Sequence, residues 1–421
     1  MDNGHLFILL ACSLGLLMTW GVGANDLANV MSTSIGSRTI STRQALLIGI
    51  LFEFAGAFLG GDEVMDTIST GIINMQMLDH TPNILIYGML AVLCAGATWM
   101  LTASYFGLPV SITNAIVGSI VGFGAIVLGL NAIQWTKVSC IAISWIASPA
   151  LAGISAYLLF ISIQRLILGS ATPYQNAKRY IPSYLFLVGS ILSSITIINA
   201  LHHLGFVFSV LLKTSIAAGF GLLTMLLGSA FLRRYQLKST ALHRTQFVYV
   251  EKMFGVLMAF TACAMVFAHG SNDVPIAVGP IATVVNIVEH AGHMAAHEPL
   301  PQWLLMLGCL GVITGLLMYG RKVIATVGSK ITSLTPSRAF AATLAAATTV
   351  VISTSLGIPV SATQTLVGGV LGVGLARGIG ALNLRVIRNI FMSWVITLPA
   401  ASLLTILYYH LFKWVFATIG A

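Results

Sequence analysis

Charged side chains are scarce in this sequence. Asp, Glu, Lys and Arg together make up 7% of the 421 residues, 57% of the residues are hydrophobic, and the mean hydropathy is +0.95. Soluble domains carry about 25% charged residues. The scarcity therefore excludes a soluble globular protein and indicates an integral membrane protein.

The signatures of common enzyme and metal-site classes are also missing. The chain has no P-loop, H-E-x-x-H or G-x-S-x-G motif, and its few cysteines lie in apolar runs without C-x-x-C spacing. The spacing of His290, His293 and His297 could bind a metal, but a solvated external loop explains them better. We therefore expect no enzyme, no resident cofactor, no disulfide framework and no metal site.

Long apolar runs dominate what is present. A helix that crosses a bilayer needs about 20 mostly apolar residues. The sequence offers twelve such runs, at residues 6–22, 44–61, 83–106, 107–134, 138–164, 183–201, 204–232, 253–272, 303–320, 339–356, 357–376 and 389–412. We therefore expect an all-α polytopic membrane protein of about twelve transmembrane segments, folded as one transporter domain over residues 1–421 in the lipid bilayer.

Basic residues gather in alternate connections between these runs. The net charge of +9 thus reports membrane topology and does not indicate a nucleic-acid partner. If connections such as those holding Arg38 and Arg233 are cytoplasmic, twelve crossings place both termini outside. Asp2 stands where a signal peptide is basic, and no Arg/Ser-rich presequence is visible. We therefore expect a retained first segment and a multi-pass protein of the bacterial plasma membrane, that is, the inner membrane.

Two motif pairs recur at almost one spacing. "GANDLANVMS" at 23–32 matches "GSNDVPIAVG" at 270–279, and "GLPVSITNAIVGSIVGFG" at 107–124 matches "GIPVSATQTLVGGVLGVG" at 357–374 with nine identities in eighteen positions. Seven crossings, an odd number, separate equivalent segments, so the repeat is expected to be inverted. We predict a first repeat at 1–134, connecting helices and a basic cytoplasmic loop at 135–252, and a second repeat plus a C-terminal helix at 253–421.

The first motif pair places Asp26 and Asp273 in the membrane interior, where we expect a discontinuous helix. A carboxylate at mid-depth costs about 2.5–3.5 kcal/mol and usually faces a cavity or an ion pathway. Capping of a broken helix is the structural alternative, but the duplication favours a functional role. Carboxylate and amide oxygens are hard ligands for a small cation or a proton. The predicted coupling-cation residues are Asn25, Asp26, Asn29, Asn272 and Asp273.

The second motif pair predicts two helix N-termini aimed at one central point. Gly permits a turn, and Pro109 and Pro359 suit the first helical position. Free N–H groups at a helix start carry about half a positive charge and bind anions without a lysine. Capping alone is the alternative for the hydroxyls and amides, whereas the later glycines are expected to serve close helix packing. The predicted substrate ligands are Asp26, Asp273, Ser111, Thr113, Asn114, Ser361, Thr363 and Gln364.

Anion donors beside two aspartates favour coupled transport. The aspartates would repel a bare anion, so a cation or proton is expected to accompany it. Glu53 is the only acidic residue within another apolar run, and we take it as a further coupling group, with a hydrogen-bonded structural carboxyl as the alternative.

Together these motifs resemble the inorganic phosphate transporter (PiT) family of ion-coupled carriers. The resemblance covers nearly the whole chain and includes "GANDLAN", "AHGSNDV", both "PVS-x-T" segments and "YGRKVIATVGSKITSLTPSRAF" at 319–340. It implies an inverted-repeat fold, a central phosphate site and co-transport of protons or sodium, and some bacterial relatives carry phosphate with a divalent metal. By motif, Asp26 and Asp273 match the paired aspartates, Glu53 the first-half glutamate, and Ser111 and Ser361 the paired serines.

The chain departs from the family pattern in its second half. Pro275 and Ile276 stand where Ala and Asn are usual, Thr343 stands where relatives often have a glutamate, and histidine is common at the positions of Asn114 and Gln364. These departures leave the coupling ion and its stoichiometry open.

The sequence points to a symporter for phosphate and leaves three alternatives. A sulfate or other tetrahedral-oxyanion carrier is the nearest, although a carboxylate can accept a hydrogen bond from protonated phosphate and not from sulfate. An anion channel is disfavoured by the interior carboxylates. A phosphate sensor without transport is compatible with the same residues. The sequence leaves open whether the chain forms a homodimer.

Overall fold

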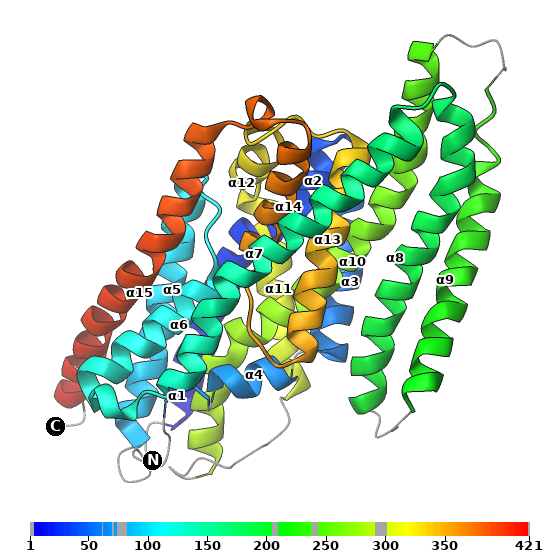
Figure 1. Ribbon diagram of the computed structural model, residues 1–421. Helices are drawn as coiled ribbons and strands as arrows, with labels where there is room; N and C mark the ends of the chain where they lie inside the picture. The colour runs from blue at the N-terminus through cyan, green and yellow to red at the C-terminus, as the bar shows by residue number, and fades with distance from the viewer. Residues whose placement is uncertain are drawn as a thin grey trace.

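A computed structural model describes residues 4–60, 62–69, 71–73, 82–203, 209–237, 243–290 and 301–419. These residues form a bundle of α-helices without a strand (Figure 1). Eight of the described helices are long and apolar enough to cross a membrane. The expected all-α polytopic membrane fold is confirmed, whereas the number of twelve crossings stays a prediction.

The helices follow the apolar runs of the sequence. In the first part of the chain they are α1 (Gly4–Val22), η1 (Gly23–Leu27), α2 (Ala28–Gly36), α3 (Thr42–Leu59), α4 (Asp62–Ser69), α5 (Pro82–Phe106), α6 (Ile112–Phe123), η3 (Gly124–Leu128), η4 (Leu130–Ala132), α7 (Trp135–Ile163) and η5 (Gln164–Leu168). The remaining elements are α8 (Pro173–His203), α9 (Val210–Leu232), α10 (His243–Glu289), α11 (Gln302–Tyr319), α12 (Arg321–Ala325), η6 (Thr326–Lys330), α13 (Pro336–Ser355), α14 (Ala362–Ala376), η7 (Ile379–Ala381) and α15 (Leu384–Ile419).

Helix α9 shows why this bundle requires a lipid surrounding. It packs against α8 at the edge of the bundle (Figure 1), and Leu211, Leu222 and Leu227 on it are exposed. A helix that is apolar all round is stable only when it is buried or in a membrane. The protein is therefore a multi-pass membrane protein.

Equivalent helices of the two sequence halves run in opposite directions. The chain from α1 to α2 and the helix α7 lead away from the end of the molecule near which α15 ends, whereas α10 and α15 run toward that end (Figure 1). Both chain termini lie at this one end. An inverted repeat would produce this arrangement, and the repeat itself stays a prediction.

Backbone turns recur at the spacing of the sequence repeat. Gly107 and Gly357 have φ of +67° and +65°, and Gly129 and Gly378 have φ of +91° and +101°. Side chains other than glycine rarely adopt such values. Gly107 lies in the turn after α5, and Gly357 lies in the turn after α13. The sequence predicted a turn at both glycines.

Glycines on α6 and α14 pack closely on helices from the other half. An added Cβ at Gly122 would lie 2.7 Å from Ser402 Cβ on α15, and one at Gly372 would collide with the carbonyl oxygen of Gly153 on α7. Small residues permit such close approach of membrane helices. These contacts fit the packing role expected for the glycines. They also involve α7, which the predicted boundary at residue 134 leaves outside the first repeat.

The expectation of a broken helix at the G-x-N-D motifs is wrong. Gly23–Leu27 is a single π-turn inside a helix that continues from α1 into α2, and α10 stays helical through its own copy of the motif and through Pro275 and Pro280. Every backbone polar group inside a membrane needs a partner, and a continuous helix supplies most of them.

The breaks occur instead at the G-[LI]-P-V-S motifs. Residues 108–111 and 358–361 precede the short helices α6 and α14 without being helical. Pro109 and Pro359 do not occupy the first helical position, because Ser111 and Ser361 form the N-caps two residues later. The serine hydroxyls provide the helix start that the prolines were expected to provide.

Candidate functional site

Asn25 and Asp26 hold the extended segment before α6. Asn25 Nδ2 donates to Leu108 O at 2.9 Å and its Oδ1 accepts from Val110 N–H at 3.0 Å. Asp26 Oδ2 accepts from Ile112 N–H at 3.0 Å. The first N–H groups of a helix lack partners within it and attract negative charge. Asp26, fully buried, therefore caps a neighbouring helix and not its own.

Asn272 plays the matching role before α14. Its Nδ2 donates to Val360 O at 2.7 Å and also contacts Asp273 Oδ1. Asn25 and Asn272 thus each hold one of the two extended segments from a G-x-N-D motif. The backbone atoms differ, because Asn25 bonds to Leu108 O and Val110 N–H and Asn272 bonds to Val360 O.

His269 connects Asp273 to Glu53. The imidazole Nδ1 lies 2.7 Å from Glu53 Oε1 and Nε2 lies 3.2 Å from Asp273 Oδ2. All three side chains are buried. One imidazole between two carboxylates reduces the repulsion that these acids would otherwise exert on each other. Glu53 on α3 is thereby joined to the aspartate on α10.

Sequence reasoning missed His269. The internal repeat gives no sign of it, because Val22 stands at the equivalent place before the first G-x-N-D motif. The available signal was its position in "AHGSNDV", four residues before Asp273, which puts both side chains on one helix face.

Hydrogen bonds cross between the two halves at the centre. Thr363 Oγ1 donates to Asp26 Oδ1 at 2.7 Å, and Asn29 Nδ2 donates to Thr363 O at 3.4 Å. Thr113 Oγ1, in the first half, donates to Val360 O in the second half at 2.9 Å. The predicted residues from four separate segments therefore meet in one buried volume.

Ser111 and Ser361 are N-caps in this structure. Ser111 Oγ accepts from Asn114 N–H at 3.3 Å, and Ser361 Oγ accepts from Gln364 N–H at 3.1 Å. Each hydroxyl can still donate its own hydrogen. The capping role is therefore compatible with an added contact to an anion.

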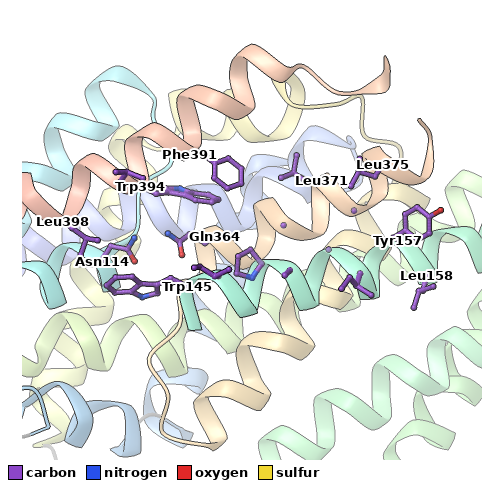
Figure 2. Close-up of a pocket in the computed structure, with 18 residues that line it drawn as sticks. Asn114, Trp145, Tyr157, Leu158, Gln364, Leu371, Leu375, Phe391, Trp394 and Leu398 are labelled. Atoms are coloured by element: carbon purple, nitrogen blue, oxygen red, sulfur yellow. The ribbon is translucent and has the colours of Figure 1, made fainter. Parts of the chain in front are cut away.

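The side-chain oxygens of Asn114 and Gln364 have no hydrogen-bond partner among the described residues. Their side chains are 2% and 3% exposed. Figure 2 shows the two amides facing each other between the rings of Trp145 and Trp394. Buried polar groups normally have partners, so these two oxygens are candidate contacts for a ligand.

Apart from Ser190 Oγ on α8, three further buried oxygens lack partners in the described structure. They belong to Asn29 (Oδ1), Ser32 (Oγ) and Glu53 (Oε2). Such oxygens suit a small hard cation. No cluster of three or more His, Cys, Asp or Glu residues with metal-binding geometry occurs in the described ranges, and His293 and His297 lie outside them.

A pair of threonines occupies the position of the absent second-half glutamate. Thr343 Oγ1 lies 2.9 Å from Thr33 Oγ1, and both side chains are fully buried. Ile276, which replaces a possible amide ligand, is also buried. The second half thus contributes fewer anionic or amide oxygens to this region than the family pattern implies.

Comparisons with known proteins agree with these residues. The model of the phosphate transporter family matches residues 22–405. A Haemophilus influenzae protein named "Putative phosphate permease" is 44% identical over 98% of both chains. The Arabidopsis thaliana protein named "Inorganic phosphate transporter 2-1, chloroplastic" is 36% identical over 96% of this chain and 71% of its own.

A solved structure titled "The sodium-dependent phosphate transporter" has the same fold. Its TM-score is 0.88 at 34% identity, over 97% of this chain and 99% of that chain. The family match spans both G-x-N-D motifs and both short helices, and its members are transporters and not enzymes. The chain therefore belongs to the phosphate transporter family.

Proposed function

We propose that this protein is a secondary active symporter that moves inorganic phosphate across the plasma membrane, coupled to protons or sodium. The observation that carries the proposal is that the starts of α6 and α14 meet, where Thr113 Oγ1 donates to Val360 O, beside the unpartnered amide oxygens of Asn114 and Gln364. Helix N-termini attract anions through the helix dipole. The family membership supports phosphate as that anion.

The substrate ligands proposed on each side are equivalent. Ser111, Thr113 and Asn114 serve from α6, and Ser361, Thr363 and Gln364 from α14. Asp26, which Thr363 contacts, and Asp273, beside Asn272, would accept a hydrogen bond from a protonated phosphate oxygen. Sulfate at neutral pH has no such hydrogen to donate. This difference favours phosphate over a sulfate carrier.

The coupling cation binds among oxygens of the G-x-N-D motifs and Glu53. Asn25, Asn29 and Asp26 contribute from the first motif, and Asn272 and Asp273 from the second. A cation or proton is needed because three buried carboxylates accompany one imidazole, and unpaired buried charge is costly. The related sodium-dependent structure favours sodium, and a divalent metal travelling with phosphate is a further form of cargo.

Alternating access follows from an inverted repeat around this site. In the present conformation the bonds from Thr363 to Asp26 and from Thr113 to Val360 join the halves. Movement of one half against the other would break these bonds and expose the site to alternate sides. The basic end of the bundle faces the cytoplasm and both termini face outward, in a bacterial inner membrane.

Uptake of labelled phosphate into proteoliposomes tests the proposal. Sodium and proton gradients are imposed separately, with Asp26→Asn and Asp273→Asn beside the wild type. We expect uptake with one gradient and loss of at least tenfold in both variants, because each variant removes a charge from the site. Sulfate accumulation without phosphate uptake would overturn the substrate assignment. Saturable phosphate binding without uptake under either gradient would favour a sensor.

A further inference from the structure

An apolar groove reaches the amide pair from the side of the bundle. The groove has a volume of about 700 Å³ and lies between α6, α7, α14 and α15. Its outer walls include Ile146 and Ile154 of α7 and Val395 of α15, with exposed fractions of 76%, 59% and 65%. In a membrane protein, exposed apolar walls of this kind face lipid tails. The groove therefore opens toward the bilayer.

Three polar atoms without partners lie at the inner end of this groove. They are the oxygens Asn114 Oδ1 and Gln364 Oε1 and the indole Nε1 of Trp145, none of which is hydrogen-bonded within the described part of the chain. Trp394 differs, because its Nε1 donates to Pro109 O at 3.1 Å. Figure 2 shows Trp145 beside the two amides. The inner end thus offers two acceptors and one donor.

We propose that the groove binds a single-chain fatty acid that enters from the bilayer. The tail lies along α7 and α15, and the carboxyl group reaches Trp145, Asn114 and Gln364. A neutral carboxylic acid can bond to two of these three atoms at once, since its O–H donates to one amide oxygen and its carbonyl accepts from the indole N–H. Burial in apolar surroundings favours this neutral form.

The polar end determines the selectivity of this site. Lipid tails are as apolar as the groove walls, so tail contacts alone give little preference over bulk lipid. The volume lies within the range of about 300–1,000 Å³ typical of small-molecule sites. A phosphate ion would leave the apolar walls without contacts, and a phospholipid keeps its headgroup at the membrane surface. A single-chain acid satisfies both parts of the groove.

This site has a consequence that rests on the proposed function. Asn114 and Gln364 are also proposed ligands of the transported anion, so the fatty acid and phosphate would compete for them. A bound fatty acid would therefore inhibit uptake from within the membrane.

Photo-crosslinking in proteoliposomes tests the site without depending on transport. A diazirine-labelled C16 fatty acid is incorporated at low density, and labelled peptides are identified by mass spectrometry. We expect concentrated labelling of residues 146–158 and 391–398, and about threefold to tenfold less in Trp145→Phe, which keeps the ring and loses the donor. The methyl ester of this fatty acid lacks the O–H. In the wild type it should label these residues as weakly as the free acid labels Trp145→Phe.

Two neighbouring variants separate the groove from general lipid contact. Ala150 lines the groove, whereas Leu151 is 57% exposed and does not line it. Ala150→Phe should fill the groove and remove the labelling, and Leu151→Phe should leave it unchanged. Labelling of α9 equal to that of α7, or unaffected by Ala150→Phe and Trp145→Phe, would overturn the proposal.

Added phosphate tests whether the fatty acid and the transported anion compete for the amides. If 10 mM phosphate with the coupling cation lowers groove labelling, the two ligands share the amides. Groove-specific labelling that phosphate leaves unchanged would overturn the competition and leave the fatty-acid site standing. Phosphate uptake measured in the same liposomes reports separately whether the transport proposal holds.

Discussion

At the scale of residues, the three buried carboxylates are held by different groups. Asp26 accepts from Ile112 N–H and Thr363 Oγ1, whereas Asp273 and Glu53 share His269. The sequence pointed to the aspartates because the motif is repeated. It could not reveal the imidazole contact, because Glu53 and His269 are joined only by the packing of α3 on α10.

Replacing His269 should destabilise the protein and stop transport. His269→Leu leaves Glu53 and Asp273 buried without the group between them, and breaking a buried charged pair costs about 3–5 kcal/mol. We expect a lower Tm in detergent, measured by the fluorescence of the native tryptophans, and loss of phosphate uptake. His269→Gln, which keeps hydrogen-bonding groups, should recover part of the stability. Equal Tm values for His269→Leu and the wild type would contradict the role of the imidazole.

The N-cap serines allow capping and anion binding to be separated. Glycine is tolerated at an N-cap with a loss of a few tenths of a kcal/mol, whereas alanine costs about 0.5–2 kcal/mol. Ser361→Gly should therefore leave the Tm nearly unchanged. It should lower phosphate uptake at least tenfold, because the anion loses the serine hydroxyl as a hydrogen-bond donor. Full uptake in Ser361→Gly would mean that this serine only caps α14.

At the scale of elements, the positions of the helix breaks were only partly predictable. The G-[LI]-P-V-S segments are non-helical, as a turn-forming glycine and a proline indicated. The G-x-N-D segments stay helical, and the amides of Asn25 and Asn272 within them bond to segments 83 and 88 residues away. Local sequence carries no direct information on such distant partners.

Close helix packing gives a test at this scale. In Gly372→Ala on α14 the new methyl group would collide with Gly153 O on α7, and such overpacking costs about 1–3 kcal/mol. Gly219→Ala on α9 is the matched control, because nothing lies within 4 Å of its added Cβ. We expect a lower Tm for the first and an equal or higher one for the second. A Tm for Gly372→Ala at or above that of Gly219→Ala would contradict the packing.

At the scale of the whole molecule, membrane class and helical architecture followed from composition and apolar runs. The contacts that join the halves could not be predicted in this way, since Thr363 bonds to Asp26, a carboxylate 337 residues away. The repeat indicated that the motifs would meet, and the bonds that connect them depend on how the opposing segments pack.

Removing the hydrogen bond from Thr363 to Asp26 should make the extended segments before α6 and α14 more mobile. Thr363→Val removes a hydrogen bond to a charged group, worth about 1.5–3 kcal/mol. We expect faster amide hydrogen exchange over residues 357–361 and over 108–112. Thr348→Val is the control, because Thr348 Oγ1 bonds to Leu344 O within α13. Unchanged exchange in Thr363→Val would show that the bond does not hold the halves.

The most direct measurement is calorimetric binding of phosphate to the purified protein, with and without sodium and at two pH values. The proposed site lies between the amides on α6 and α14, and anion binding there depends on a cation or proton. We expect saturable binding that strengthens with one of them and falls at least tenfold in the Asn114→Leu, Gln364→Leu double variant. Equal binding by the double variant and the wild type, or binding indifferent to both sodium and pH, would contradict the account.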